Sequence, residues 1–282
     1  MQAGMIGLGA MGLGIAKNLA QAGFLKAVYN RTPSKSTKFA REHNVTIYDS
    51  PEALAAKVSV IFISVSADQD VMDIIRAIAK TVQPESIIVD LSTINSATAQ
   101  NAARLLAQKD AAFLDAPVSG GVEGADKGTL AMMVGGDGKI LRKVNPLLET
   151  IATRIIHIGP NGSGQGAKAV NQIMAAGINQ AVTEALAFAK AQDLPLTKVI
   201  EIISGGAAGN WFLEHRGHTM IQGKFKPGFK VALHHKDLKM CQSMAKHNGA
   251  EIPLVDITVS NYEQLMQQGH GNEDISALFR LK

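Results

Sequence analysis

Short apolar runs alternate with helix-like patterns over the first part of the chain. The runs cover residues 3–9, 26–30, 58–65, 86–92 and 111–117. Uninterrupted apolar runs of this length, separated by helices, are typical of parallel strands whose two faces are both buried. The pattern therefore predicts an α/β domain in which helices cover both faces of a doubly wound parallel sheet.

After residue 166 the pattern changes. Helical periodicity follows, and no further β-branched run like those above occurs; the helical segments lie near residues 167–191, 195–204, 230–248 and 253–268. We therefore place a domain boundary in the glycine-rich stretch between the two patterns. Residues 1–161 form the predicted α/β domain, and residues 162–282 form an all-α domain opened by a long interdomain helix.

The first predicted strand runs directly into the sequence GLGAMG, which precedes a helical pattern. In this context Gly7 permits a tight turn, Gly9 lets a diphosphate approach the backbone, and Gly12 lets helix and strand pack closely. The positive end of the helix favours the anion. A bare strand-to-helix turn would also contain glycine, but the flanking elements favour a Rossmann-type dinucleotide-binding domain. Its predicted cofactor contacts are Gly7, Leu8, Gly9, Ala10, Met11 and Gly12.

The second strand ends in Tyr-Asn-Arg-Thr, which bears on the choice of dinucleotide. NAD-dependent enzymes place an acidic residue here to bind the ribose hydroxyl, and none is present. Arg31 can bind a 2′-phosphate through a charge-assisted fork, while Asn30 and Thr32 add neutral hydrogen-bonding groups. The alternative is that Arg31 is a solvated loop residue. We predict NADP as the cofactor, with NAD as the second choice.

A glycine-rich stretch, residues 115–138, begins at the end of the fifth apolar run. Ser119, Gly120 and Gly121 come just after this strand, at the edge where open α/β sheets bind ligands. A hydroxyl beside two backbone N–H groups would suit a carboxylate. Taken alone, the stretch is better explained as a flexible connecting turn.

The helix that opens the second domain has a lysine in an unusual place. Lys168 lies in its first turn, behind four glycines, where the helix dipole disfavours a cation. Lys168, Asn171 and Gln172 share one helical face. A cation and two amides are poorly suited to packing in an apolar core. They are well suited to lining a binding site for an anionic substrate. We expect the positive helix end and the glycine amides to lower the pKa of Lys168, which would help it to release a proton.

Composition excludes several other classes of protein. The chain has 282 residues, a net charge of +4 and 5% aromatic residues, with no basic run of the kind that binds nucleic acid. No apolar run reaches membrane-spanning length, and the N-terminus lacks the basic region of a signal peptide. The single cysteine, Cys241, cannot form an intramolecular disulfide. We expect a cytoplasmic protein without a metal site and without a nucleic-acid or membrane partner.

Four motifs together resemble the β-hydroxyacid dehydrogenase family, which includes 3-hydroxyisobutyrate dehydrogenase, tartronate semialdehyde reductase and the glyoxylate and succinic semialdehyde reductases. They are IGLGAMG, DAPVSGG, GSGQGAKAVNQ and HKDL, in this order between residues 6 and 238. The resemblance implies hydride transfer between NADP(H) and a small carboxylate-bearing aldehyde or 3-hydroxy acid, by a homodimer or homotetramer. It leaves open which aldehyde or acid is used.

The resemblance also implies roles for individual residues. The implied catalytic residues are Lys168, as general acid and base, and Asn171. The implied substrate contacts are Ser119, Gly120, Gly121, Gln172 and Asp237, and the further cofactor contacts are Val65, Thr93 and Lys236. Many family members have asparagine at the position of Gln172, which leaves the role of this residue open.

Two alternatives remain. Imine reductases share this architecture but place another group where Lys168 stands. A non-catalytic cofactor-binding scaffold would need a missing catalytic group or an appended reader domain, and the sequence pattern indicates neither. Within the helical domain, residues 205–217 are a candidate for shaping the substrate pocket, although Trp211 and Phe212 would serve equally well as core.

Overall fold

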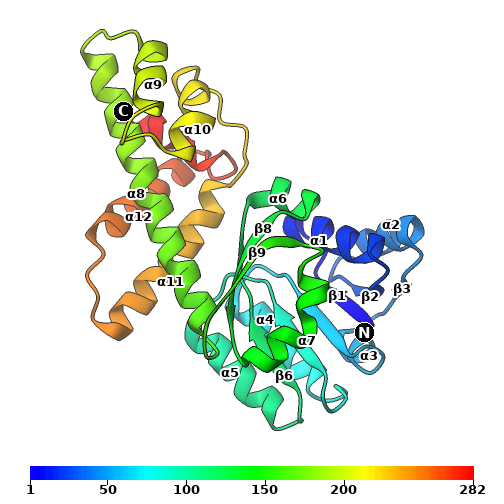
Figure 1. The fold of residues 1–282 in the computed structure, drawn as a ribbon. Coiled ribbons are helices and arrows are strands. Elements are labelled where there is room, and N and C mark those ends of the chain that lie inside the picture. Colours follow the sequence, from blue (N-terminus) through cyan, green and yellow to red (C-terminus); the bar gives the residue numbers. More distant parts are fainter. The chain divides into compact units, whose positions relative to one another are not determined.

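A computed structural model describes the whole chain, residues 1–282 (Figure 1). The chain divides into two compact units, Met1–Lys168 and Ala169–Lys282. The first unit contains all the strands, and the second is helical. One long helix, α8 (Ser163–Ala191), begins in the first unit and continues into the second.

A parallel sheet of six strands forms the centre of the first unit. Its order is β3-β2-β1-β4-β5-β6, so the direction of winding reverses between β1 and β4, the point where open α/β sheets bind ligands. Every residue of β1, β4 and β5 is buried, as the apolar runs predict. The Rossmann-type sheet is thereby confirmed. The strands are β1 (Ala3–Ile6), β2 (Leu25–Tyr29), β3 (Thr46–Ile47), β4 (Val60–Ile63), β5 (Ile87–Asp90) and β6 (Ala112–Asp115).

The sheet has a hydrophobic core on each face. Alternate residues of β4 belong to different clusters: Val60 and Phe62 pack in one, and Ile61 and Ile63 pack in the other. This division follows from the period of two along a strand. The connecting helices are α1 (Ala10–Gln21), α2 (Pro33–His43), α3 (Pro51–Ala55), α4 (Asp68–Ile78) and α5 (Ser96–Ala107).

Three strands beyond β6 were not predicted from the sequence. Strand β8 (Leu130–Gly135) runs antiparallel to β6 and to β7 (Val118–Ser119), and β9 (Ala152–Gly159) runs parallel to β8. The apolar run of β8 is short and lies inside the glycine-rich stretch, while β9 is mostly exposed and lacks a continuous apolar run. The helices α6 (Gly121–Lys127) and α7 (Gly138–Leu148) come before and after β8.

The second unit is a helical domain with its own core. Residues of α8 pack with α9 (Leu196–Ser204), α10 (Trp211–Ile221), α11 (Val231–Asn248), α12 (Pro253–Gln267) and the short helix η1 (Ile275–Leu281). Four of these helices lie where the sequence predicts them. Helix α10 was not predicted from the sequence. Its N-cap is Asn210, whose Oδ1 accepts the Leu213 N–H at 2.9 Å. Phe212 belongs to the core, whereas Trp211 is 61% exposed and stacks on His215.

None of the helices combines the length and the apolar composition needed to cross a membrane.

Candidate active site

The three glycines between β1 and α1 have different surroundings. Gly7 has a φ of +98°, and a Cβ there would lie 2.2 Å from the carbonyl oxygen of Ser64. A Cβ at Gly12 would lie 2.1 Å from the carbonyl oxygen of Gly7, but no protein atom lies within 4 Å of a Cβ at Gly9. The fold therefore requires glycine at Gly7 and Gly12, while Gly9 borders open space that a ligand can occupy.

The start of α1 fits the diphosphate of a dinucleotide. Its N-cap is Gly9, so no cap side chain accepts a hydrogen bond from the first-turn N–H groups, and the first turn holds no acidic residue. The first N–H groups of a helix lack intrahelical acceptors, and the dipole favours an anion beside them. The open space at Gly9 adjoins these groups. The backbone from Gly7 to Gly12 is thus suited to hold a dinucleotide.

The residues at the end of β2 have protein partners. Asn30 accepts the Leu8 N–H with Oδ1 at 2.8 Å and donates from Nδ2 to the Thr32 carbonyl at 3.0 Å. The Arg31 side chain is 87% exposed, and its Nη1 lies 3.3 Å from Asp70 Oδ1. Asn30 therefore joins β2 to the glycine loop, and Arg31 has an anionic neighbour that the local sequence does not reveal. Thr32 is the N-cap of α2 but makes no side-chain cap bond.

Two further predicted cofactor contacts lie in the loops after β4 and β5. The Val65 N–H donates to Ser92 Oγ at 3.0 Å, and Val65 Cγ1 lies 3.3 Å from the Cβ position of Gly7. Thr93 follows Ser92 and is partly buried. These contacts bring the loops after β1, β4 and β5 together at the carboxyl end of the sheet.

The segment Ser119-Gly120-Gly121 lies where β7 turns into α6. Ser119 ends β7, opposite Ala131 of β8. Gly120 and Gly121 have φ values of +132° and +64°. Residues other than glycine rarely adopt this backbone conformation. Both glycines are exposed and Ser119 is partly exposed. The segment is a defined turn with two exposed glycines and a partly exposed serine.

The N–H groups at the start of α8 bind a side chain of the protein, that of Asp115. The Gly162 N–H donates to Asp115 Oδ1 at 2.8 Å, and the Gln165 N–H donates to Asp115 Oδ2 at 3.1 Å. A Cβ at Gly164 would lie 2.4 Å from the carbonyl oxygen of Asp115 and 2.5 Å from that of Met133. The glycines therefore let α8 approach the sheet, and a protein carboxylate sits at its positive end. The sequence analysis did not anticipate a carboxylate at this position. A lowered pKa of Lys168 stays a prediction.

Asp115 and Asp90 are paired neighbours at the ends of β6 and β5, and both are fully buried. Burial raises the pKa of both carboxyls, that of Asp90 to about 7. Hydrogen bonds from Gly162 and Gln165 offset part of this effect at Asp115. Asp90 accepts the Ser92 N–H with one oxygen, but its Oδ2 has no hydrogen-bond partner. The fold thus opposes the ionisation of Asp90.

Lys168 is only 6% exposed. A lysine in the first turn of a helix is ordinarily exposed at the surface. The burial of Lys168 excludes an ordinary surface lysine. Gln165, Lys168 and Gln172 are all buried and lie at helical spacings that place them on one face of α8. A buried ammonium is retained where it is paired or where its proton is used.

In the second unit, four predicted residues form a chain of contacts. Asn171 Nδ2 donates to Gln172 Oε1 at 2.8 Å, and Gln172 Nε2 donates to Asp237 Oδ2 at 2.7 Å. Asp237 Oδ1 lies 2.9 Å from Lys236 Nζ. Gln172 therefore joins α8 to the HKDL motif of α11, and both ends of its amide have protein partners. Direct contact of Gln172 with substrate stays a prediction.

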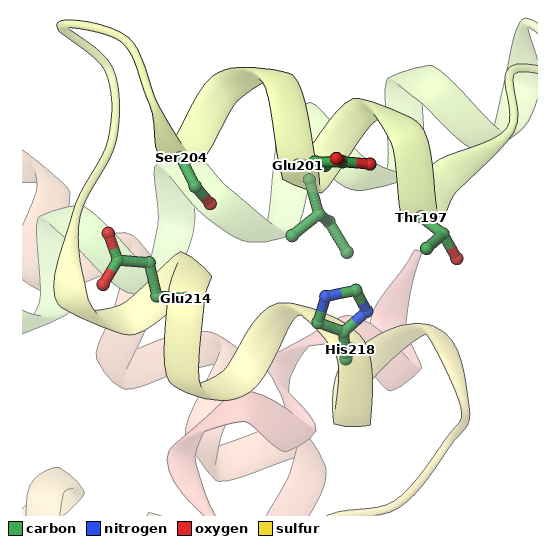
Figure 2. Close-up of a pocket in the computed structure, with 6 residues that line it drawn as sticks. Thr197, Glu201, Ser204, Glu214 and His218 are labelled. Carbon is green, nitrogen blue, oxygen red and sulfur yellow. The ribbon is translucent and has the colours of Figure 1, made fainter.

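A separate hollow of about 410 Å³ lies between α9 and α10 (Figure 2). His218 projects from α10 toward α9 in this view. Trp211 and Phe212 are not among the residues that line the hollow. Its two glutamates would repel a carboxylate substrate. The lining residues are Thr197, Ile200, Glu201, Ser204, Glu214 and His218.

Two family models together cover nearly the whole chain. Residues 2–159 match the NAD binding domain of 6-phosphogluconate dehydrogenase, and residues 162–282 match a model described as NAD-binding of NADP-dependent 3-hydroxyisobutyrate dehydrogenase. The chain is 36% identical over 276 residues to an uncharacterized oxidoreductase of Shewanella frigidimarina, with 97% of this chain and 95% of that protein covered. It is 34% identical to the 2-hydroxy-3-oxopropionate reductase of Escherichia coli, with 99% and 96% covered.

Solved structures give the same grouping. The 3-hydroxyisobutyrate dehydrogenase of Mycobacterium tuberculosis, determined with L-serine, aligns with a TM-score of 0.91 at 31% identity, covering 100% of this chain and 99% of that one. An imine reductase from Myxococcus stipitatus aligns with a TM-score of 0.68 at 17% identity, which shows a shared fold alone. The chain belongs to the β-hydroxyacid dehydrogenase family of oxidoreductases, which use a nicotinamide cofactor.

Proposed function

We propose that the protein interconverts a small carboxylate-bearing aldehyde and the corresponding 3-hydroxy acid with NADP(H), and that Lys168 is the general acid and base. The observation that carries this proposal is the burial of Lys168 on a helical face that it shares with two other buried polar residues, Gln165 and Gln172. An ammonium held out of water beside a reacting carbonyl is well suited to exchange a proton with it.

The cofactor supplies or accepts the hydride at the carbonyl carbon when it is bound. Lys168 gives a proton to the developing alkoxide during reduction and takes it back during oxidation. The backbone from Gly7 to Gly12 holds the diphosphate, and the loops bearing Val65 and Thr93 hold the nicotinamide end. Asn171 orients the lysine and a substrate oxygen, while the contact of Gln172 with Asp237 keeps this face in place.

The turn at Ser119 and the names of two relatives support the proposed substrate class. Gly120 and Gly121 are exposed and Ser119 is partly exposed. In this proposal the Ser119 hydroxyl and the N–H groups of the two glycines donate hydrogen bonds to the substrate carboxylate. The names of the relatives mention 2-hydroxy-3-oxopropionate and L-serine. Both molecules are three-carbon acids with oxygen on the carbon farthest from the carboxylate. We propose a substrate of this pattern, and Asp237 as a residue near it.

NADP is the proposed cofactor because no carboxylate extends from the end of β2 and Arg31 is exposed there. A 2′-phosphate would draw the guanidinium away from Asp70. The exposed pair is easily exchanged, because ion pairs between solvated side chains contribute only about 0–1 kcal/mol.

We also propose that the protein is a homo-oligomer. Large apolar side chains project into solvent from α8 and α12, among them Val170, Met174, Phe188 and Ile257, each more than half exposed. Apolar groups gathered on helix faces often mark association surfaces. Analytical ultracentrifugation tests this proposal; a monomer at all concentrations would refute it.

The test of the catalytic proposal is Lys168→Ala, measured as NADPH oxidation with a panel of acid-bearing aldehydes. We expect kcat to fall by about 100-fold or more, the scale of a lost general acid, with little change in NADPH affinity. Lys190→Ala is the matched control, since Lys190 is an exposed lysine of the same helix. Near-normal turnover of Lys168→Ala would remove the lysine from the chemistry.

The substrate class is tested with Ser119→Ala. Loss of a hydrogen bond to a charged group should weaken binding of acid-bearing aldehydes by about 1.5–3 kcal/mol, while aldehydes of equal length without a carboxylate should bind as before. Equal losses for both classes would mean that Ser119 only maintains the turn.

A further inference from the structure

Gln165 is a completely buried amide three residues before Lys168. Its side chain crosses from α8 to the loop after β5. Oε1 accepts the Ile94 N–H at 3.1 Å, and Nε2 donates to the Ser92 carbonyl at 2.8 Å. One side chain thus binds the backbone on both sides of Thr93.

The loop that carries Thr93 is held at three places. Besides the amide of Gln165, Ser92 Oγ accepts the Val65 N–H at 3.0 Å, and the Asn95 N–H donates to Asp68 Oδ1 at 2.8 Å. The Val65 and Asp68 contacts tie the loop to neighbouring parts of the sheet edge. The Gln165 contact ties the loop to the helix that bears the lysine.

Gln165 is itself fixed at its backbone. Its N–H donates to Asp115 Oδ2 at 3.1 Å, so the first turn of α8 is anchored to the end of β6. Lys168 follows after three residues, close to one helical turn, and therefore lies on the same face as Gln165. The path from the Thr93 backbone to the Lys168 backbone runs through one amide and one turn of helix.

We propose that Gln165 is a positioning residue, which sets the distance between the Thr93 loop and Lys168 and hence the alignment of the hydride with the proton donor. This rests on the proposed function, in which Thr93 lies beside the nicotinamide and Lys168 gives the proton. Small displacements at a reacting centre have large kinetic effects, because reaction requires the atoms to be held at near-contact geometry.

The chemistry of the contact explains why glutamine is needed. The loop presents one donor, the Ile94 N–H, and one acceptor, the Ser92 carbonyl, and an amide matches both. A carboxylate would repel the carbonyl, and methionine would fill the volume without either hydrogen bond. Asparagine is shorter by one methylene and would not reach both groups.

The first experiment measures single-turnover hydride transfer in Gln165→Met with NADPH and with 4-deuterated NADPH. We expect the hydride step to slow by about 10-fold or more, the isotope effect on kcat/KM to rise toward its full value, and the NADPH dissociation constant to change little. Gln180→Met is the matched control. Gln180 is another buried glutamine of α8, bonded to Thr258 Oγ1 at 3.1 Å, so its loss should lower stability without slowing hydride transfer.

Gln165→Glu provides a second readout that does not depend on the folding of the methionine variant. A protonated carboxyl has one donor and one acceptor, as the amide has, whereas the ionised form has no donor. The hydride-transfer rate of Gln165→Glu relative to wild type should therefore increase as the pH is lowered. A purely structural role would restore stability at low pH but leave this rate ratio unchanged.

The outcomes separate this inference from the proposed function. If Lys168→Ala is impaired while Gln165→Met transfers hydride as fast as Gln180→Met, the positioning role of Gln165 is wrong and the catalytic proposal stands. A rate ratio for Gln165→Glu that does not change with pH would also overturn it. If Lys168→Ala turns over normally, both proposals fail together.

Discussion

Helices α1 and α8 both begin after a cluster of glycines, but the two clusters have different surroundings. At α1 the N-cap residue, Gly9, borders open space, and no acidic side chain lies in the first turn. At α8 a Cβ on Gly164 would meet backbone atoms, and the buried carboxylate of Asp115 accepts N–H groups of the first turn. The start of α1 can therefore bind the anionic group of a ligand. At the start of α8, the side chain of Asp115 already occupies the corresponding position.

The comparison shows that glycine before a helix does not by itself indicate a ligand site. What decides is whether the N–H groups already have an acceptor. The N–H groups at the start of α8 are bonded to Asp115. The buried face of this helix holds Lys168 and the amide of Gln165. The following predictions test this distinction, beginning with the largest expected effect.

The first compares Gly164→Ala with Gly166→Ala. A methyl group at Gly164 would lie 2.4 Å from a carbonyl oxygen, and backbone must move to admit it. We expect a loss of about 3 kcal/mol or more in the free energy of unfolding. At Gly166 the nearest atom, Ser96 Oγ, is 4.0 Å away, so alanine should stabilise the helix by about 0.5–1 kcal/mol. Chemical denaturation measures both, and equal stabilities would contradict the close packing of α8.

The second compares the two neighbouring buried carboxyls. Asp90 has a pKa raised from 3.8 to about 7 by burial, so its stabilising contribution is complete below pH 4 and is lost as the pH rises through 7. Asp90→Asn should therefore be more stable than wild type at pH 8, by on the order of 3 kcal/mol, and the difference should shrink as the pH falls toward 4.

Asp115→Asn should have the opposite effect at pH 8. Its amide has one acceptor oxygen for two helix N–H groups, and leaving a buried donor unpaired costs about 1–3 kcal/mol. Thermal or chemical denaturation across this pH range checks both variants. The same sign for both at pH 8 would mean that Asp115 does not serve α8 as described.

Much of this arrangement follows from local sequence, and the rest does not. The parallel strands were predictable because each is a short apolar run buried on both faces, and the loop at Gly7 because strand, glycines and helix are contiguous. The role of Asp115 was not predictable, since it lies 47 residues before its partner Gly162. The Arg31 contact with Asp70 likewise joins residues 39 apart. Pairings of this kind are set by sheet order and not by any pattern within a window of sequence.

The third prediction concerns Gly9→Ala. The backbone at Gly9, with φ −74° and ψ −165°, is open to alanine, and no atom lies within 4 Å of the new methyl. Stability should change by less than about 0.5 kcal/mol. The methyl would enter the space of the diphosphate, so the NADPH dissociation constant should rise by about 10-fold or more. Fluorescence titration measures this, and an unchanged constant would mean that the dinucleotide does not approach Gly9.

The smallest effect concerns the cofactor phosphate. Arg31→Ala should reduce the preference for NADPH over NADH in kcat/KM by about 10-fold, the lower end for a hydrogen bond to a charged group, because Arg31 must first leave Asp70. Asp70→Asn is the matched variant and should strengthen NADPH binding. Added salt should weaken NADPH binding more than NADH binding. A ratio that Arg31→Ala does not alter would refute this assignment.

The most direct test of the account measures NADPH affinity and single-turnover hydride transfer in Gly9→Ala and Lys168→Ala side by side. The two helix starts should separate cleanly. Gly9→Ala should bind NADPH weakly but transfer hydride at nearly the wild-type rate once saturated. Lys168→Ala should bind NADPH normally and transfer hydride about 100-fold more slowly or worse. If Lys168→Ala instead weakens NADPH binding as Gly9→Ala does and reacts at the wild-type rate when saturated, α8 is part of the cofactor site and the central claim is wrong.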